Sequence, residues 1–432
     1  MNTQSPNPRS RAALMLSRVL EKNQLLEDVL PEGLKNLKPL DRSLARAITS
    51  TTLRNLGIID ALIDQMLDRP LPKAAKNVRG ALRIGLAQVL FMEVANHGAV
   101  HETVELIPAN SKFRGLVNAL LRRADRQGEK LLKRMNKGRT NTPEWLYKSW
   151  SEAYGKETAT KIAKAGLFEA PLDINVKSDP EGWAEKLGAI LLPTGHLRLV
   201  DGANVPELAG YEDGEWWVQD FAASLPAKLF GDLTGKRVLD LCAAPGGKTI
   251  QLALKGAEVT ALDRSAQRLK RLEENMDRLG LKVEVKAADA VGFAPATPFD
   301  AILLDAPCSS TGTLRRHPDV AWLKTQEDVD KLVGLQTRLL HAAVDQLAPG
   351  GTLIYSTCSL QPEEGEQQIE NLLAARSDIT LSPVQPEELP ELTEVVSEKG
   401  YLRAFPCHYG THEIPKARGM DGFFAARLVK QS

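Results

Sequence analysis

The chain has 432 residues, of which 43% are hydrophobic and 25% are charged, as is usual for a soluble globular protein. Its four cysteines are too few for a disulfide framework, and none of them forms the C-x-x-C pair of a zinc site. No uncharged apolar run approaches the length of a membrane span, and arginines interrupt the first twenty residues, so neither a transmembrane segment nor a secretory signal is expected. We therefore predict a cytoplasmic protein with reduced thiols, no metal site and two or three domains.

Charge is divided unevenly along the chain. The formal net charge is zero, from 55 basic and 55 acidic residues. Residues 1 to 139 carry 24 of the basic and 13 of the acidic residues, which leaves 31 and 42 for the remainder. A basic N-terminal third favours a polyanionic partner, although a solvated helical surface explains the same excess equally well.

The N-terminal third has the apolar pattern of helices. Apolar residues recur with a period near 3.6, for example from Ile58 to Leu67, and strand-like alternation is scarce. A further helix is expected from Arg79 to Ala95, with Gly80 and Gly85 at close contacts with other helices. Residues 1–138 are therefore predicted to form an all-α bundle.

The pattern changes near residue 139 and again near residue 226. Residues 139–225 mix short helices and strands, which predicts a small α+β connector. Strands and helices then alternate to the C-terminus, so residues 226–432 are predicted to form a Rossmann-like α/β domain with a mostly parallel sheet. The expected strands are 237–241, 259–262, 282–286, 300–304, 351–355 and 422–429. The acidic stretch Pro386 to Glu398 is expected to be a surface excursion.

Two of the predicted strands end in a cysteine-containing turn. Asp305 and Cys308 follow the strand 300–304, and Cys358 follows the strand 351–355. Ligands of open α/β sheets lie beyond the carboxyl ends of the strands, where these side chains would gather. The spacing therefore predicts a site with a carboxylate and two thiols.

The strands that come first in this domain carry a second set of signals. Gly246 and Gly247 stand between a strand and a helix, where the backbone can approach a ligand closely. A triphosphate-binding loop is disfavoured, because Cys242 occupies the position of its first glycine. Asp263 and Asp289 follow the next two strands, where they would bind ribose hydroxyls and an adenine amino group. Each of the two could instead be a helix cap, but their serial order favours a nucleoside pocket.

Three motifs occur in order along the chain, at residues 240–249 (DLCAAPGGKT), 305–309 (DAPCS) and 356–359 (STCS). They resemble those of the RNA 5-methylcytosine methyltransferases of the NOL1/NOP2/Sun group. Residues 53–57 (LRNLG), 101–105 (HETVE) and 113–123 (FRGLVNALLRR) resemble the NusB RNA-binding fold. A NusB-like domain fused to such a core is the arrangement of the bacterial RsmB/Sun enzymes, which methylate 16S ribosomal RNA.

Two stretches depart from the pattern of this family. Residues 173–175 read Asp-Ile-Asn where the family often has Arg-Val-Asn. The segment from Tyr401 to Met420 is longer than expected before the motif 421–424 (DGFF). Neither departure touches the three motifs.

The resemblance implies that S-adenosylmethionine is the cofactor and that carbon 5 of a cytosine is methylated. It implies that Cys358 is the nucleophile and that Cys308 assists removal of the carbon 5 proton and release of the enzyme. Asp305 would bind the edge of the base, with Lys248 beside it. In a competing assignment Cys308 attacks, as a Pro-Cys cysteine does in DNA cytosine methyltransferases. The implied cofactor-binding residues are Cys242, Ala243, Ala244, Pro245, Gly246, Gly247, Lys248, Asp263, Asp289 and Asp305.

The implied partner is 16S ribosomal RNA, either naked or on an assembling small subunit. An unpaired loop or bulge is expected as the target, because a stacked base would first have to leave its helix. The protein is expected to be a monomer. Two other functions stay open, a transfer-RNA cytosine-C5 methyltransferase with the same core and a non-catalytic RNA-binding assembly factor. The thiol pair counts against the second, because a binding protein has no need of it.

Overall fold

The structure is a computed structural model that describes residues 7–72, 74–200 and 202–432. It contains two compact units, Met1–Phe168 with Leu314–Lys324, and Glu169–Thr313 with Thr325–Ser432. The three-part division with boundaries near residues 138 and 225 stays a prediction that rests on motifs and composition. Within the described ranges, no helix is both long enough and apolar enough to cross a membrane.

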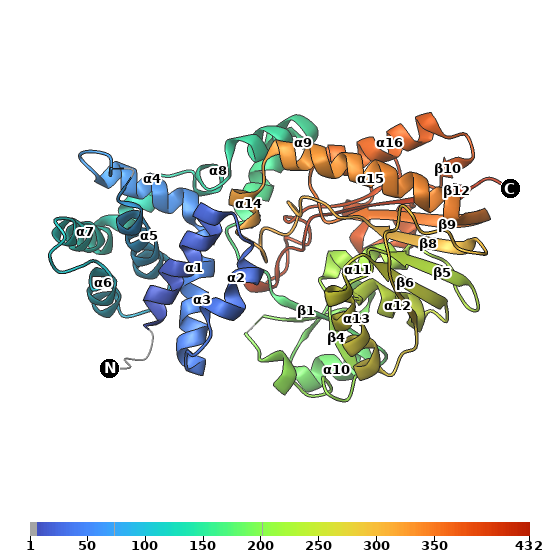
Figure 1. The fold of residues 1–432 in the computed structure, drawn as a ribbon, viewed down its shortest axis with the longest axis horizontal. Coiled ribbons are helices and arrows are strands. Elements are labelled where there is room, and N and C mark those ends of the chain that lie inside the picture. Colours follow the sequence, from blue (N-terminus) through green and yellow to red (C-terminus); the bar gives the residue numbers. More distant parts are fainter. Residues whose placement is uncertain (1–6, 73, 201) are drawn as a thin grey trace. The chain divides into compact units, whose positions relative to one another are not determined.

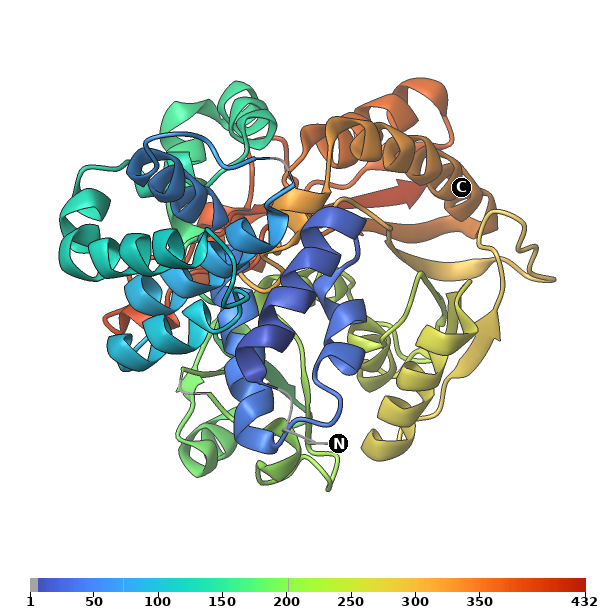
Figure 2. The ribbon, with the colours of Figure 1, turned by 60° about the vertical axis from the view of Figure 1, so that its left-hand side comes forward.

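The first unit is helical, which confirms the predicted bundle (Figures 1 and 2). Gly85 faces Leu121 so closely that an added Cβ would lie 2.7 Å from its Cδ2 atom, as expected for a close helix contact. At Gly80 nothing lies within 4 Å, so that expectation was wrong. The helices are α1 (Pro8–Lys22), α2 (Leu26–Gly33), α3 (Pro39–Arg54), α4 (Leu56–Met66), α5 (Lys76–Phe91), α6 (Asn96–Val104), α7 (Arg114–Lys133), α8 (Lys137–Thr140) and α9 (Glu144–Ala165).

The helical unit also contains a segment from much later in the sequence, Leu314–Lys324, which includes α14 (Val320–Leu323). Asp319 Oδ2 accepts a hydrogen bond from the Leu26 amide at 2.9 Å, and the Trp322 indole donates to the Leu53 carbonyl at 2.9 Å. The stretch 53–57 that resembles NusB is therefore one of the surfaces that hold this segment.

The second unit begins with a small antiparallel sheet in the order β2-β3-β1-β4, with α10 (Pro180–Leu187) beside it. This sheet matches the predicted α+β connector. Its strands are β1 (Leu172–Val176), β2 (Ile190–Leu191), β3 (Leu197–Leu199) and β4 (Trp216–Val218).

The main sheet has the order β10-β12-β9-β8-β5-β6-β7, with β11 on β12. Strands β5 to β9 pair in parallel, and β12 pairs antiparallel with its neighbours. Every strand predicted for this domain is present, with ends displaced by a few residues. The strands are β5 (Arg237–Leu241), β6 (Glu258–Asp263), β7 (Glu284–Ala287), β8 (Phe299–Asp305), β9 (Leu347–Thr357), β10 (Ile379–Leu381), β11 (Leu402–Ala404) and β12 (Phe423–Lys430).

Helices cover both faces of this sheet (Figure 1). Helices α11 (Phe221–Lys228), α12 (Gly247–Leu254) and α13 (Ala266–Leu279) lie on one face, and α15 (Gln326–Gln346) and α16 (Glu366–Ala375) lie on the other. Val238 belongs to the core of the first face and its neighbour Leu239 to the core of the second. Because helices bury both faces of a parallel sheet, ligands of such sheets bind beyond the carboxyl ends of the strands.

The stretch Pro386 to Glu398 lies mostly at the surface, as expected, and three apolar residues anchor it in the core. Leu389, Leu392 and Val395 are 4%, 1% and 0% exposed. They are three residues apart, which is the repeat of a 3₁₀ helix, and short turns of this kind form here. The acidic residues between them face solvent.

Candidate active site

The glycine-rich turn connects β5 to α12. Gly246 has φ +104° and precedes the helix, and its amide donates to the Ala243 carbonyl at 2.8 Å. An added Cβ at Gly246 would lie 2.9 Å from Leu272 Cγ, so both conformation and space require glycine. The turn thus directs the N-terminus of α12 towards the space beyond the strand ends.

Asp263 is the last residue of β6 and is 4% exposed. Its carboxylate accepts hydrogen bonds from the Ser265 amide at 2.9 Å and the Ala244 amide at 3.4 Å. The Ser265 hydroxyl, rather than Asp263, caps α13 by accepting from the Arg268 amide. The helix-cap alternative is therefore wrong for Asp263, which joins the strand end to the glycine-rich turn.

Asp289 lies two residues beyond the end of β7, and β7 is the parallel neighbour of β6, which carries Asp263. Its side chain is exposed and accepts from the Val291 amide at 3.0 Å. In the described chain a loop, and no helix, leads from it to β8, so the cap alternative is wrong here too. Both acids lie at the carboxyl ends of neighbouring parallel strands.

Asp240 has an unusual environment that its place in the motif did not predict. It is 1% exposed; Oδ2 accepts from the Thr249 hydroxyl at 2.6 Å, and Oδ1 has no partner among the described residues. Burial raises the pKa of Asp240 to about 7, against the lowering effect of the Thr249 hydrogen bond. Burial likewise raises the pKa of the nearby Cys242 thiol to about 12, which keeps it neutral.

Lys248 and Asp305 form an ion pair of 2.7 Å between the start of α12 and the end of β8. Their side chains are 10% and 32% exposed. The Ser356 hydroxyl donates to the other Asp305 oxygen at 3.0 Å, and the Lys248 ammonium lies 4.8 Å from the centre of the Phe423 ring. Asp305 is thus held from both sides while part of it stays accessible.

A cavity of about 280 Å³ borders this pair. The Gln219 amide oxygen accepts from the Trp217 indole at 2.8 Å and the Asn175 amide at 2.9 Å, so this wall is fixed. Among the lining residues, Tyr211, Trp217, Asn275 and Arg278 were not singled out from the sequence; the tryptophan pair Trp216-Trp217 was the available signal. The lining residues are Tyr211, Trp217, Val218, Gln219, Asp220, Ala223, Asp240, Ala243, Ala244, Pro245, Gly247, Lys248, Ile250, Asn275, Arg278 and Asp305.

The two cysteines meet because β8 and β9 are parallel neighbours. Asp305 pairs in register with Ser356, so Cys308 and Cys358 follow at similar distances beyond the two strand ends. Their sulfur atoms are 3.4 Å apart, and Cys358 Sγ lies 3.6 Å from the Ser310 hydroxyl. The hydrogen bond to Cys358, followed by burial, holds the pKa of Cys308 well above that of an ordinary thiol. Cys308 therefore keeps its proton at neutral pH.

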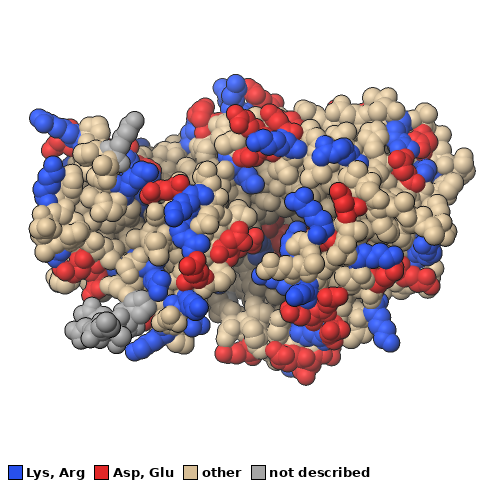
Figure 3. All heavy atoms as spheres, in the orientation of Figure 1, with Lys and Arg blue, Asp and Glu red and all other residues tan. Residues whose placement is uncertain are grey.

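Some basic side chains of the helical unit are paired with acids. Asp60 accepts from both Arg79 and Arg83, and Arg114 is paired with Glu105. On the face drawn in Figure 3, Lys and Arg are interspersed with Asp and Glu. The basic excess of the sequence thus gives no single patch on that face. In the described residues, no group of three or more His, Cys, Asp or Glu could hold a metal ion.

A mostly parallel sheet with a glycine turn and acids at successive strand ends is the arrangement of a Rossmann-like domain that binds a nucleoside-containing cofactor. Residues 231–429 match the model of the family described as 16S rRNA methyltransferase RsmB/F, and residues 6–126 match the NusB family. The Ribosomal RNA small subunit methyltransferase B of Erwinia tasmaniensis is 36% identical, over 98% of this chain and 99% of that protein. The chain belongs to the RsmB/F family of 16S rRNA methyltransferases.

Solved structures share this architecture. The crystal structure of PH0851 has a TM-score of 0.71 and 21% identity, over 99% of this chain and 100% of that one, a likeness of fold. A methyltransferase homolog protein from Pyrococcus horikoshii has a TM-score of 0.54 and 28% identity, over 66% of this chain and 93% of that one.

Proposed function

We propose that this protein transfers a methyl group from S-adenosylmethionine to carbon 5 of a cytosine in 16S ribosomal RNA. The observation that carries the proposal is the pair of thiols, 3.4 Å apart, at the ends of two adjacent parallel strands. A single thiol is enough to attack a base. A second, protonated thiol beside it suits a reaction with two stages, in which one thiol attacks the base and the other assists release of the product. Membership of the RsmB/F family supports the ribosomal substrate.

The residues of the first three strand ends of the main sheet fit the cofactor. Among the described residues the buried Oδ1 of Asp240 has no partner and can accept from an amino group, and the turn at Gly246 leaves no room for a side chain. Asp263 would accept hydrogen bonds from the ribose hydroxyls, and Asp289 would accept one from the adenine amino group. Residues 242–248 and Asp305 would complete the site. When bound, S-adenosylmethionine supplies an electrophilic methyl group.

Cys358 would begin the reaction at the substrate. Its thiolate adds to carbon 6 of cytosine, which forms a carbon–sulfur bond and makes carbon 5 nucleophilic enough to accept the methyl group. Asp305, oriented by Lys248 and Ser356, would accept a hydrogen bond from the cytosine amino group and so orient the base.

Cys308 would act in the second half. The methylated carbon 5 still carries its proton; water takes this proton, the electron pair of the carbon–hydrogen bond returns to the ring, and the bond between carbon 6 and Cys358 breaks, so that Cys358 leaves as a thiolate. Cys308 is 3.4 Å from the departing sulfur and is the group we assign to assist this step, because its retained proton can hydrogen-bond to the leaving thiolate. The reverse assignment, with Cys308 as the attacker, is tested below.

We further infer that the target is an unpaired loop or bulge, because extrusion of a stacked base costs a few kcal/mol. A NusB-like domain over residues 1–138 would supply salt-sensitive contacts with the RNA backbone, followed by a connector over 139–225 and the catalytic domain over 226–432. The protein would act as a monomer in the cytoplasm, where thiols stay reduced.

The test incubates the wild type, Cys308→Ser and Cys358→Ser with 16S RNA and labelled S-adenosylmethionine. We expect methylation by the wild type alone, and on denaturing gels a covalent RNA adduct that Cys308→Ser accumulates and Cys358→Ser never forms. Inverted behaviour would make Cys308 the attacker. Methylation of transfer RNA in place of 16S RNA would refute the proposed substrate. If no RNA is methylated or trapped, the protein is a binding factor.

A further inference from the structure

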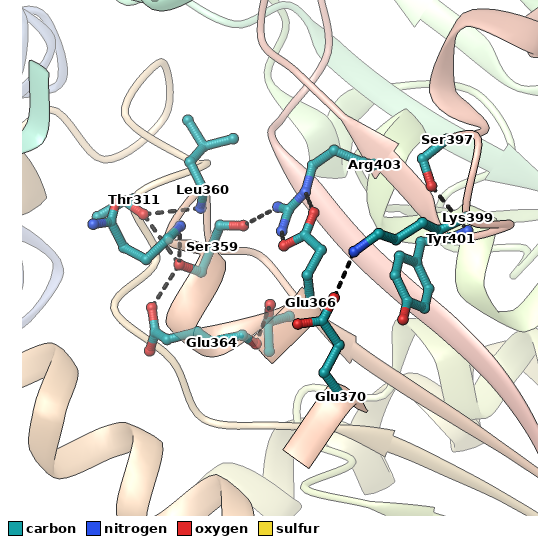
Figure 4. A network of polar contacts seen from close by, with 12 residues as sticks. Thr311, Ser359, Leu360, Glu364, Glu366, Glu370, Ser397, Lys399, Tyr401 and Arg403 are labelled. Carbon is teal, nitrogen blue, oxygen red and sulfur yellow. Dashed lines mark hydrogen bonds and ion pairs between the residues drawn. The ribbon is translucent and has the colours of Figure 1, made fainter. Parts of the chain in front are cut away.

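A buried carboxylate lies behind the two cysteines and does not belong to any of the three motifs. Glu364 ends the 3₁₀ turn Pro362–Glu364 and is 0% exposed. Its Oε1 accepts from the Ser309 amide at 2.8 Å and the Gln336 amide at 3.0 Å. Its Oε2 accepts from the hydroxyl of Ser309 at 2.5 Å and from that of Ser359 at 2.5 Å, the second of which Figure 4 shows. Four donors for one carboxylate is the full satisfaction that a buried charge requires.

The donors are the residues that adjoin the two thiols. Ser309 directly follows Cys308, and Ser359 directly follows Cys358. One carboxylate therefore holds the main chain of one cysteine loop, through the Ser309 amide, and the side chains of both loops. Because the strands end before these residues, the sheet ladder alone does not fix the separation of the thiols.

Further contacts hold Glu364 and this assembly in place. The carbonyl oxygen of Glu364 accepts from the Tyr355 hydroxyl at 2.8 Å, and Gln336 also donates to the Pro307 carbonyl at 2.8 Å, on the other side of Cys308. Arg403 donates to the Ser359 carbonyl at 2.6 Å (Figure 4). The backbone of Glu364 is therefore held by Tyr355, and the loops that its carboxylate binds are held in addition by Gln336 and Arg403.

We propose that Glu364 is a positioning residue for methyl transfer, which holds the loops of Cys308 and Cys358 at the separation that the two-thiol reaction needs. The proposal rests on the proposed function of the thiol pair. Glu364 does not touch the substrate or the cofactor in this role. It acts through Ser309 and Ser359.

The substitution Glu364→Gln tests this role with the smallest change of shape. Glutamine replaces one acceptor oxygen by a donor, which must then face either the two N–H groups on Oε1 or the two hydroxyls on Oε2. Either the bond from the Ser309 amide is lost, or the hydroxyls of Ser309 and Ser359 must accept from the glutamine amide in place of donating to a charged oxygen, which weakens both bonds. We expect kcat for RNA methylation to fall by about 10- to 100-fold, with KM for RNA and for S-adenosylmethionine within threefold of the wild type, because a displacement near 1 Å has such an effect on a reaction rate.

A second measurement separates positioning from a general loss of structure. The hydrogen bond to Cys358 and, less strongly, the charge of Glu364 both raise the pKa of Cys308. In Glu364→Gln both effects weaken. We therefore expect the pH midpoint for alkylation of Cys308 by iodoacetamide, followed by peptide mass spectrometry, to move to lower pH. A more reactive thiol in a slower enzyme is a combination that simple destabilisation does not produce.

The matched control is Glu370→Gln, the same substitution on α16, where the surface pair with Lys399 is lost (Figure 4). It should leave kcat and the alkylation midpoint unchanged. If Glu364→Gln does not fold, Ser309→Ala removes one hydroxyl donor alone and should still lower kcat several-fold.

The proposal is overturned if Glu364→Gln keeps kcat within twofold, or loses activity only through KM, or alkylates with the wild-type midpoint. A wild type that methylates no RNA would refute the proposed function instead. In that case the alkylation midpoint, which needs no RNA, would still decide whether Glu364 orders the thiols.

Discussion

A buried ion pair in the connector sheet yields the most demanding prediction of stability. Arg198 on β3 and Asp173 on β1 are both 0% exposed and form two hydrogen bonds of 2.6 and 2.7 Å. Arg198 also donates to the carbonyls of Ala417 and Gly419, at 2.5 and 2.7 Å. These contacts join the two departures from the family pattern, the acid at position 173 and the long segment before residue 421.

The substitution Arg198→Met removes the charged partner of the buried Asp173 carboxylate, which keeps its hydrogen bond from the Phe221 amide at 3.2 Å. It also removes the charged donor of the Ala417 and Gly419 carbonyls. Breaking one partner of a buried pair costs about 3–5 kcal/mol. With a shift of about 2–4 °C per kcal/mol, the melting temperature of this unit should fall by roughly 6–20 °C. The segment around residues 417–419 should also become more sensitive to proteolysis.

Differential scanning calorimetry and limited proteolysis measure both effects. The double variant Asp173→Asn/Arg198→Met removes both charges, keeps an acceptor for Phe221, and should recover at least half of the loss. The control Lys399→Met breaks an exposed pair and should leave the melting temperature nearly unchanged. If Arg198→Met melts no lower than Lys399→Met, the pair does not anchor the segment and our reasoning fails.

Two further predictions concern the cofactor side of the site. Asp263→Asn, which removes the charged acceptor proposed for the ribose hydroxyls, should weaken S-adenosylmethionine binding by about tenfold, or about 1.4 kcal/mol, in isothermal titration calorimetry; unchanged affinity would place the ribose elsewhere. Burial raises the pKa of Asp240 in the folded state to about 7, from an ordinary value of 3.8, so the folded state binds this proton more tightly and the free energy of unfolding should fall as pH rises from about 4 to about 7. Because asparagine does not titrate, Asp240→Asn should remove this pH dependence, which amounts to as much as about 4 kcal/mol of unfolding free energy. If the melting temperatures of both proteins change in parallel across this pH range, the assignment is contradicted.

The parts of the site that follow local rules could be predicted from the sequence. Apolar runs predicted the parallel strands, and strand ends then predicted where Asp305, Cys308 and Cys358 would lie, because neighbouring parallel strands end at the same edge. The register of Asp305 with Ser356 needed no long-range information beyond the order of the strands.

What the sequence did not predict consists of pairs of residues far apart in the chain. Glu364 and Ser309 are 55 residues apart, and Arg198 and Ala417 are 219 apart. No periodicity marks such partners, because each depends on how whole elements pack. The contacts of the segment 314–324 with the helical unit, such as Trp322 with Leu53, have the same origin.

The C-terminal motif 421–424 gains a physical reason from the same geometry. The Gly312 amide donates to the Cys358 carbonyl at 3.0 Å, and the Gly422 amide donates to the Gly312 carbonyl at 2.8 Å. A Cβ on Gly312 would collide with the Gly422 carbonyl and approach that of Cys358, so three backbones meet where only glycine fits. Phe423, the next residue, places its ring beside Lys248. The start of strand β12 therefore does more than complete the sheet, because Gly422, just before it, binds the loop that follows Cys308, and Phe423 lies beside Lys248.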